Sequence, residues 1–324
     1  MTPDEQEEIF FLAQQALFNA VNVIVVTTGY GAFLLGMSIA LYSLATRPAW
    51  GRAQTALLVC ILVIFVCITW DVIYSGGTDL LEFHYSFVRT LPGGILAQGD
   101  AMANHLAAWE YLPGWPATIN LLFSDGIVVW RAWILFPHDK LWRSLLTFLM
   151  IANIGINIAD CIWDDIEVTL EESSSTILDW LSSVMSLAVN IFATLLIAWK
   201  AWSHHRVLAE ASIHKRTRVE NILLLLVESG AVYCAIQSIY AVFILMDVYA
   251  TVSFGFVKGL DAITSMSIVA AACYPVAVVV LIHGKNGSPI VETMYDDTRV
   301  GTRIGENHPL TTIGHSSGRT AVSE

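Results

Sequence analysis

Two charged residues, Asp125 and Arg131, lie six positions apart inside a run of apolar residues, and a third, Glu228, lies in a later run. Charged side chains are costly in apolar surroundings, and there they mark ion pairs, proton relays or ligand sites. Asp125 and Arg131 fall on different faces of a helix, which strains a direct pair between them. We therefore predict a polar latch in which Arg131 is held by Asp125, Glu228 or both. The alternative is a static pair that only stabilises the fold.

Polar residues recur at helical spacing in the same apolar runs. They form four stripes: Asn120, Ser124 and Arg131; Asn153, Asn157 and Asp160; Ser183, Ser186, Asn190 and Thr194; Ser229, Tyr233, Gln237 and Tyr240. A stripe at this period occupies one face of a helix, so the pattern predicts a bundle with a partly polar interior. One interpretation is hydrogen bonding between helices. The other is a cavity that opens outward and is ringed by carboxylates, namely Asp71, Asp160, Asp179 and Asp261.

The sequence offers little support for catalysis or for a resident cofactor. All nine histidines lie in loops, in the tail or at helix ends, and no pair of serine and histidine lies inside an apolar run. The last run contains no lysine for a Schiff base, since Lys258 precedes it. The five cysteines fall mostly inside apolar runs, without the spacing of a metal site, and are expected to be buried thiols. We predict neither enzyme activity nor a metal site.

The elements that position these residues are apolar runs of membrane-spanning length. The chain is 56% hydrophobic and 14% charged, whereas soluble domains are roughly 25% charged. We predict an all-α membrane protein with seven transmembrane helices, at about 20–45, 56–74, 117–136, 144–162, 177–202, 222–246 and 260–283. In the first of these, small residues at helical spacing predict close approach of a neighbouring helix: Gly29, Ala32, Gly36 and Ala40. Residues 1–19 form an N-terminal segment, 95–111 an interfacial helix, and 284–324 a disordered tail.

The charges predict the orientation of the bundle. The loops after the first, third and fifth spans, with the tail and adjoining helix ends, hold fourteen lysines and arginines, against two on the other side. The positive-inside rule then places the N-terminus outside and the tail in the cytoplasm. Acidic residues and tryptophans follow the same division: outer Trp70, Trp115, Trp163 and Trp180, and inner Trp50, Trp133, Trp142, Trp199 and Trp202. We expect the plasma membrane.

Two segments resemble a large family of multi-pass proteins from mushroom-forming fungi. The stretch from Asp125 to Trp133 resembles that family's Asp…Tyr-Arg-Cys-Tyr pattern, and residues 274–282, followed by Lys285, resemble its last helix. The resemblance covers about residues 20–290 and implies a seven-span fold in a membrane, without a known ligand. This chain departs from the pattern at Trp130, Ala132 and Trp133, where the family has tyrosine, cysteine and tyrosine.

This layout favours receptor-like sensing of an extracellular ligand. The partners we expect are the lipid bilayer and a cytoplasmic signalling protein that binds the loop 203–219 and the tail, which carry basic and Ser/Thr residues respectively. No nucleic-acid partner is expected, because the strongest basic cluster is Lys215-Arg216-Thr217-Arg218. The alternative is a transporter or membrane scaffold, in which the polar stripes line a solute path or only hold helices together.

Overall fold

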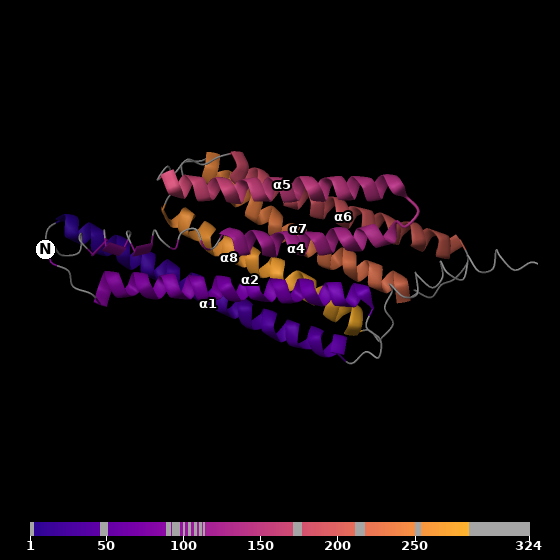
Figure 1. The fold of residues 1–324 in the computed structure, drawn as a ribbon, viewed down its shortest axis with the longest axis horizontal. Helices are drawn as coiled ribbons and strands as arrows, with labels where there is room; N and C mark the ends of the chain where they lie inside the picture. The colour runs from indigo at the N-terminus through magenta and orange to yellow at the C-terminus, as the bar shows by residue number, and fades with distance from the viewer. Residues whose placement is uncertain are drawn as a thin grey trace, which may run out of the picture. The chain divides into compact units, whose positions relative to one another are not determined.

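The computed structural model describes residues 3–45, 51–88, 92, 98–99, 101–102, 105–106, 109, 112, 114–170, 177–210, 218–249 and 254–284. Within them the helices are α1 (Pro3–Ala45), α2 (Arg52–Phe83), the short π-helix η1 (His84–Val88), α4 (Gly114–Leu135), α5 (Lys140–Leu170), α6 (Ile177–Glu210), α7 (Arg218–Tyr249) and α8 (Phe254–Gly284) (Figure 1). These residues contain no strand. The predicted tail, most of the interfacial helix and part of the 203–219 loop lie outside the described residues.

Seven of the described helices are long and apolar enough to cross a membrane: α1, α2, α4, α5, α6, α7 and α8. Large apolar side chains are exposed on their outer faces, among them Leu35, Val66, Phe148 and Leu195, while polar side chains such as Asn153 are buried. Such an arrangement is unfavourable in water and suits hydrocarbon. The predicted all-α bundle of seven transmembrane helices is confirmed.

Several helices are longer than their apolar spans. Helix α1 begins at Pro3 and has 43 residues, or about 65 Å at the α-helical rise, although the apolar run begins near Ala20. Proline is favoured at the first position of a helix, which agrees with a start at Pro3. Helix α2 likewise continues past Tyr74 to Phe83. Apolar length therefore predicted the middle of these helices and missed their ends.

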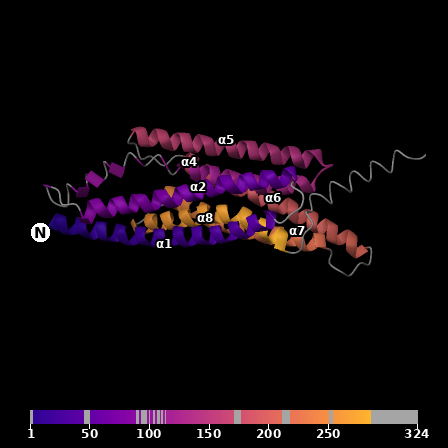
Figure 2. The same cartoon turned by 60° about the horizontal axis from the view of Figure 1, so that its bottom comes forward.

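Helix α4 is the element around which the others pack. It contacts α2, α5, α6 and α8, while α6 packs against α7 and α7 against α8. Helix α1 packs against α8 and α2, and the two views show these three helices side by side (Figures 1 and 2). Side chains on all sides of α4 can therefore meet a neighbouring helix, which makes this helix suited to carry a buried site.

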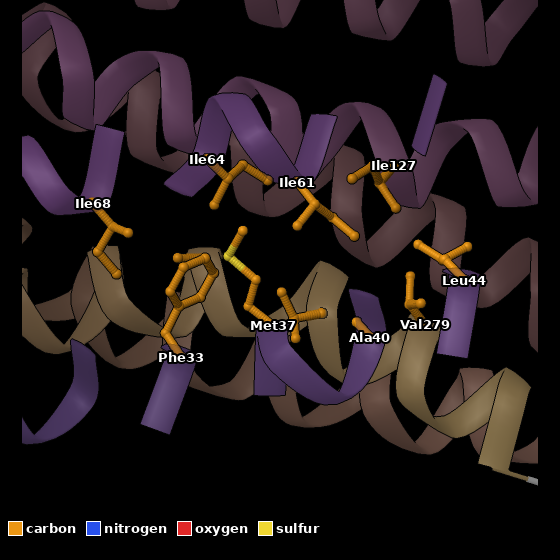
Figure 3. Close-up of a cluster of buried hydrophobic side chains, with 11 residues drawn as sticks. Phe33, Met37, Ala40, Leu44, Ile61, Ile64, Ile68, Ile127 and Val279 are labelled. Atoms are coloured by element: carbon orange, nitrogen blue, oxygen red, sulfur yellow. The ribbon is translucent and has the colours of Figure 1, made fainter. Parts of the chain in front are cut away.

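A hydrophobic cluster joins α1, α2 and α8 to one side of α4. Its side chains point toward one another in Figure 3, and they include Phe33 and Met37 of α1, Ile64 of α2, Ile127 of α4 and Val279 of α8. All are at most 7% exposed. This half of the bundle is held by apolar packing, in contrast to the half formed by α4, α5, α6 and α7.

Two glycines allow α1 to approach α8 closely. A Cβ atom at Gly29 would lie 2.5 Å from Val269 Cγ1, and one at Gly36 would lie 3.0 Å from Val276 Cγ1. Both pairs are seven residues apart along their helices, so the contact repeats every two turns. Of the four small residues in the predicted stripe, Gly29 and Gly36 are half-buried and Ala40 is buried, but Ala32 is exposed and lies off the contact.

We expect Gly29→Leu to destabilise the bundle by about 1–3 kcal/mol, because the new side chain must displace Val269 or separate α1 from α8. Gly31→Leu is the matched control, since nothing lies within 4 Å of its Cβ position, and leucine favours the helix more than glycine does. Thermal unfolding of the two purified variants in the same detergent measures the difference. Equal losses in both variants would contradict the proposed contact.

Candidate functional site

The carboxylate of Asp125 is the centre of a buried hydrogen-bond network. The side chain has no exposed surface. Its Oδ2 accepts hydrogen bonds from Asn153 Nδ2 of α5 at 2.9 Å and from Ser186 Oγ of α6 at 2.6 Å, and its Oδ1 accepts one from Asn190 Nδ2 at 2.7 Å. Donors on two helices thus bind a carboxylate on a third, which satisfies the requirement that a buried charge be paired or hydrogen-bonded.

The network extends to α7 and along α5. Asn190 Nδ2 also lies 3.0 Å from Gln237 Oε1, and Gln237 Nε2 donates to Ser186 Oγ at 3.1 Å. Asn157 Nδ2 donates to Asn153 Oδ1 at 3.0 Å. The side chains of Asp125, Ser186, Gln237 and Asn190 therefore form a closed ring of hydrogen bonds across α4, α6 and α7. Rings of this kind hold helices in one arrangement, because a shift of one helix breaks several bonds at once.

Helical periodicity explains how these residues reach one place. Asn153 and Asn157 of α5, like Ser186 and Asn190 of α6, are four positions apart and so share a face. Both faces turn toward α4, which packs against the two helices. Ser183 and Thr194 of the predicted α6 stripe are buried too, whereas Asp160 at the end of the α5 stripe is only partly buried.

A polar cavity of about 340 Å³ lies next to the network. Asp164, which is exposed, and Gly114 line its outer part. Ser186 and Gln237, which belong to the network, also line it. The other polar side chains along the wall include Asn120, Asn157, Asp160, Tyr233, Tyr240 and Thr264. The cavity therefore connects the end of the bundle where α4 begins with the network in its interior.

The carboxylates at this end are grouped differently from the predicted ring. Asp160, Asp164 and Asp179 each offer a ligand oxygen within 4.8 Å of the others. Of the predicted ring, Asp160 lines the cavity, whereas Asp71, Asp179 and Asp261 do not. Asp164 was missed because it follows the polar stripe of α5 by one turn and reads as a solvated helix end. Only the packing of α5 against α6 brings it near Asp179.

The predicted latch is wrong in its partners. Arg131 is 7% exposed, and its guanidinium donates to the hydroxyl of Tyr274 on α8 and lies 4.9 Å from the centre of that ring. Asp125 is turned toward α5 and α6, because six positions separate the two residues around the helix. Glu228 is exposed, since it lies one position, or about 100°, from the stripe that begins at Ser229.

Several buried polar atoms near the site have no hydrogen-bond partner among the described residues. They are Asn120 Oδ1, Ser124 Oγ, Arg131 Nη1, Asn190 Oδ1 and the hydroxyl of Tyr233, together with Asp160 Oδ1 nearer the surface. Buried polar atoms are paired in the great majority of cases. They belong to α4, α5, α6 and α7, and they distinguish this half of the bundle from a core that serves packing alone.

Tyr274 is the residue at the site that the sequence did not identify. Its ring stacks on that of Tyr233 of α7, with 4.6 Å between the centroids and 12° between the planes. The signal available was a single tyrosine within the apolar run of the last span, next to Pro275. A phenol with its polar hydroxyl rarely lies within lipid without a partner, yet nothing in the sequence indicated that the partner was Arg131.

The apolar exterior and the polar network define a multi-pass integral membrane protein built as a seven-helix bundle with an internal polar site. Comparisons of the chain with protein-family models, with curated proteins and with solved structures find no match. Its function must therefore be inferred from the site itself.

Proposed function

We propose that this protein is a receptor-like sensor of the plasma membrane, which binds a small extracellular ligand in the polar cavity and signals to a cytoplasmic protein. One observation carries the proposal. Ser186 and Gln237 belong both to the cavity wall and to the hydrogen-bond ring around Asp125. A ligand that bonds either side chain competes with a bond that holds α4, α6 and α7 together. Binding would thereby change the relative stability of two helix arrangements, which is the requirement for coupling.

The aromatic residues at the two ends of the bundle support an outward-facing cavity. At the cavity end, Trp115 and Trp163 donate to carboxylates of Asp165 and Glu167 at 3.0 and 2.6 Å. At the other end the rings of Trp133 and Trp202 lie against the cations Arg143 and Arg206. Basic residues concentrate on the cytoplasmic side of membrane proteins, so this asymmetry supports a cavity that faces outside.

A transporter is the second candidate, because a polar cavity also suits a solute path. Transporters commonly bind their substrates between discontinuous helices near the membrane midplane. The seven membrane-spanning helices described here are continuous, with one internal proline at Pro275. Continuous helices favour sensing over transport, and no enzymatic role is part of the proposal.

The proposal is tested with adjacent substitutions on α7. Gln237→Leu removes a side chain shared by the cavity and the ring, while Ser238→Ala removes a hydroxyl that bonds the carbonyl of Cys234 in its own helix. Cytoplasmic proteins would be crosslinked in native membranes at matched expression and quantified by mass spectrometry. We expect a signalling protein whose recovery changes at least about fivefold with Gln237→Leu and stays constant with Ser238→Ala.

Two results would overturn the proposed sensing function. One is the absence of any signalling protein from the crosslinked fraction. The other is equal recovery with wild type and Gln237→Leu. If the same membranes accumulate a solute and Gln237→Leu abolishes that uptake while Ser238→Ala does not, the transporter replaces the sensor.

A further inference from the structure

The outer part of the cavity holds a group of carboxylates. Asp160 and Asp164 line it, and Asp179 brings a third carboxylate oxygen within 4.8 Å of theirs. No lysine or arginine is among the described residues that line the cavity. Carboxylates this close repel one another wherever they are ionised, and a cation bound between them removes that repulsion. The charge of the cavity thus selects for a positively charged group near its mouth.

The inner part offers hydrogen-bonding atoms that have no partner. Tyr233 is 3% exposed, and its hydroxyl, which lies near that of Ser124, makes no hydrogen bond of normal geometry. Asn120 is 1% exposed, and although its Nδ2 donates to the carbonyl of Ile268 at 2.9 Å, its Oδ1 has no donor. Both side chains line the cavity. An unpaired buried acceptor such as Asn120 Oδ1 is costly, and a ligand that brings a donor relieves the cost.

The size and lining of the cavity limit what lies between these two ends. A volume of about 340 Å³ is near the lower limit for small-molecule sites. The rings of Tyr233 and Tyr240 form part of the wall, and aromatic rings attract organic cations as well as flat apolar groups. A bare metal ion would satisfy the carboxylates but would leave Tyr233 and Asn120 unpaired. An organic cation that extends from one end to the other satisfies both.

We propose that the cavity binds a small organic amine in its ammonium form, with the ammonium at Asp160, Asp164 and Asp179 and a hydrogen-bond donor at its far end bonded to Asn120 and Tyr233. This ligand class rests on the proposed sensing function, because it concerns the same cavity. The amine is held at its charged end by carboxylates, along its body by tyrosine rings, and at its far end by the two buried polar side chains.

Three probes of similar size separate these contributions. Tyramine carries an ammonium and a phenolic donor, phenethylamine lacks the phenol, and 3-(4-hydroxyphenyl)propionate keeps the phenol but replaces the ammonium with a carboxylate. Affinities would be measured by saturation-transfer NMR and by thermal shift, using the full-length protein in lipid nanodiscs. We expect tyramine to bind at least about tenfold more tightly than the propionate, with phenethylamine between them.

Variants then assign the binding to this cavity. We expect the double variant Asp160→Asn, Asp164→Asn to weaken tyramine at least about tenfold. The matched control Asp247→Asn, at an exposed position about two turns beyond Tyr240, should bind tyramine like wild type. Asn120→Ala should weaken tyramine while leaving phenethylamine unchanged. Thermal unfolding without ligand verifies that each variant is folded.

Three outcomes would overturn the proposal: the propionate binds as tightly as tyramine, the double variant retains full affinity for tyramine, or calcium chloride binds to wild type while tyramine does not. These outcomes can be distinguished from those that would overturn the proposed sensing function. A protein whose cytoplasmic coupling depends on Gln237 but which rejects all amines remains a sensor with a different ligand. A protein that binds tyramine at Asp160 and Asp164 without such coupling keeps the ligand class and loses the sensing role.

Discussion

We expect Asp125→Leu to abolish most of the folded protein recovered from membranes, the largest loss of stability for any single substitution in the bundle. Leucine removes the acceptor for Asn153, Ser186 and Asn190 and leaves their donors buried in apolar surroundings. Hydrogen bonds to a charged group contribute about 1.5–3 kcal/mol each. Even with partial rearrangement of the donors, the loss should exceed about 3 kcal/mol, a large part of the 5–15 kcal/mol that is typical of folded domains.

The expected order of stability is Ser124→Ala, then Asp125→Asn, then Asp125→Leu. Asparagine keeps the shape and one acceptor oxygen, but its amide nitrogen faces donors, so we expect an intermediate loss. Ser124 is the matched control, because it is adjacent on α4 and fully buried, yet its hydroxyl has no hydrogen-bond partner. Fluorescence-detected size exclusion after heating gives the midpoints directly from solubilised membranes. If Asp125→Leu unfolds at the same midpoint temperature as wild type, the network does not hold these helices together.

Periodicity in the sequence predicted which faces of the helices are buried. On α5 and α6 the spacing of Asn153 with Asn157 and of Ser186 with Asn190 was sufficient, because one turn of helix returns a side chain to the same face. The number of spans followed equally well from apolar length, since the bilayer sets a minimum of about 20 residues per helix.

The sequence did not predict which buried faces meet. The partners of Asp125 are 28 to 65 positions away, and Tyr274 lies 143 positions from Arg131. These contacts depend on the placement of α4 between α5, α6 and α8, which is a property of packing. Charge attraction suggested Glu228 for Arg131, yet the helix presents Glu228 on an exposed face. Opposite charge in the sequence was therefore weaker evidence than the face of the helix.

We expect Arg131→Met to raise the stability of the bundle while removing its cytoplasmic coupling. Among the described residues no carboxylate lies within salt-bridge distance of this guanidinium, and its Nη1 has no hydrogen-bond partner. A buried charge without a carboxylate is poorly compensated, and replacement of buried ionic groups by apolar ones of similar volume often stabilises a protein. We expect a gain of about 1–2 kcal/mol, which is several degrees in Tm.

A cycle of variants isolates the contact with Tyr274. Tyr274→Phe keeps the ring stacked on Tyr233 but removes the hydroxyl that accepts the bond from Arg131. It should therefore lower stability by about 1–3 kcal/mol, the cost of an unpaired buried donor. In the Arg131→Met background the same change should cost almost nothing. Tyr233→Phe is the matched control, because that hydroxyl has no partner.

The stability of the variants and the recovery of the signalling protein together decide what Arg131 does. An arginine that lowers stability and yet is required for recovery of the signalling protein has a role in coupling, because its cost to the fold then has a functional counterpart. Its bond to Tyr274 joins α4 to α8, whereas the ring joins α4 to α6 and α7, and neither Arg131 nor Tyr274 lines the cavity. If Arg131→Met instead unfolds the protein, and the double variant is no more stable than either single one, Arg131 is a structural residue and the signal must pass through the Asp125 network alone.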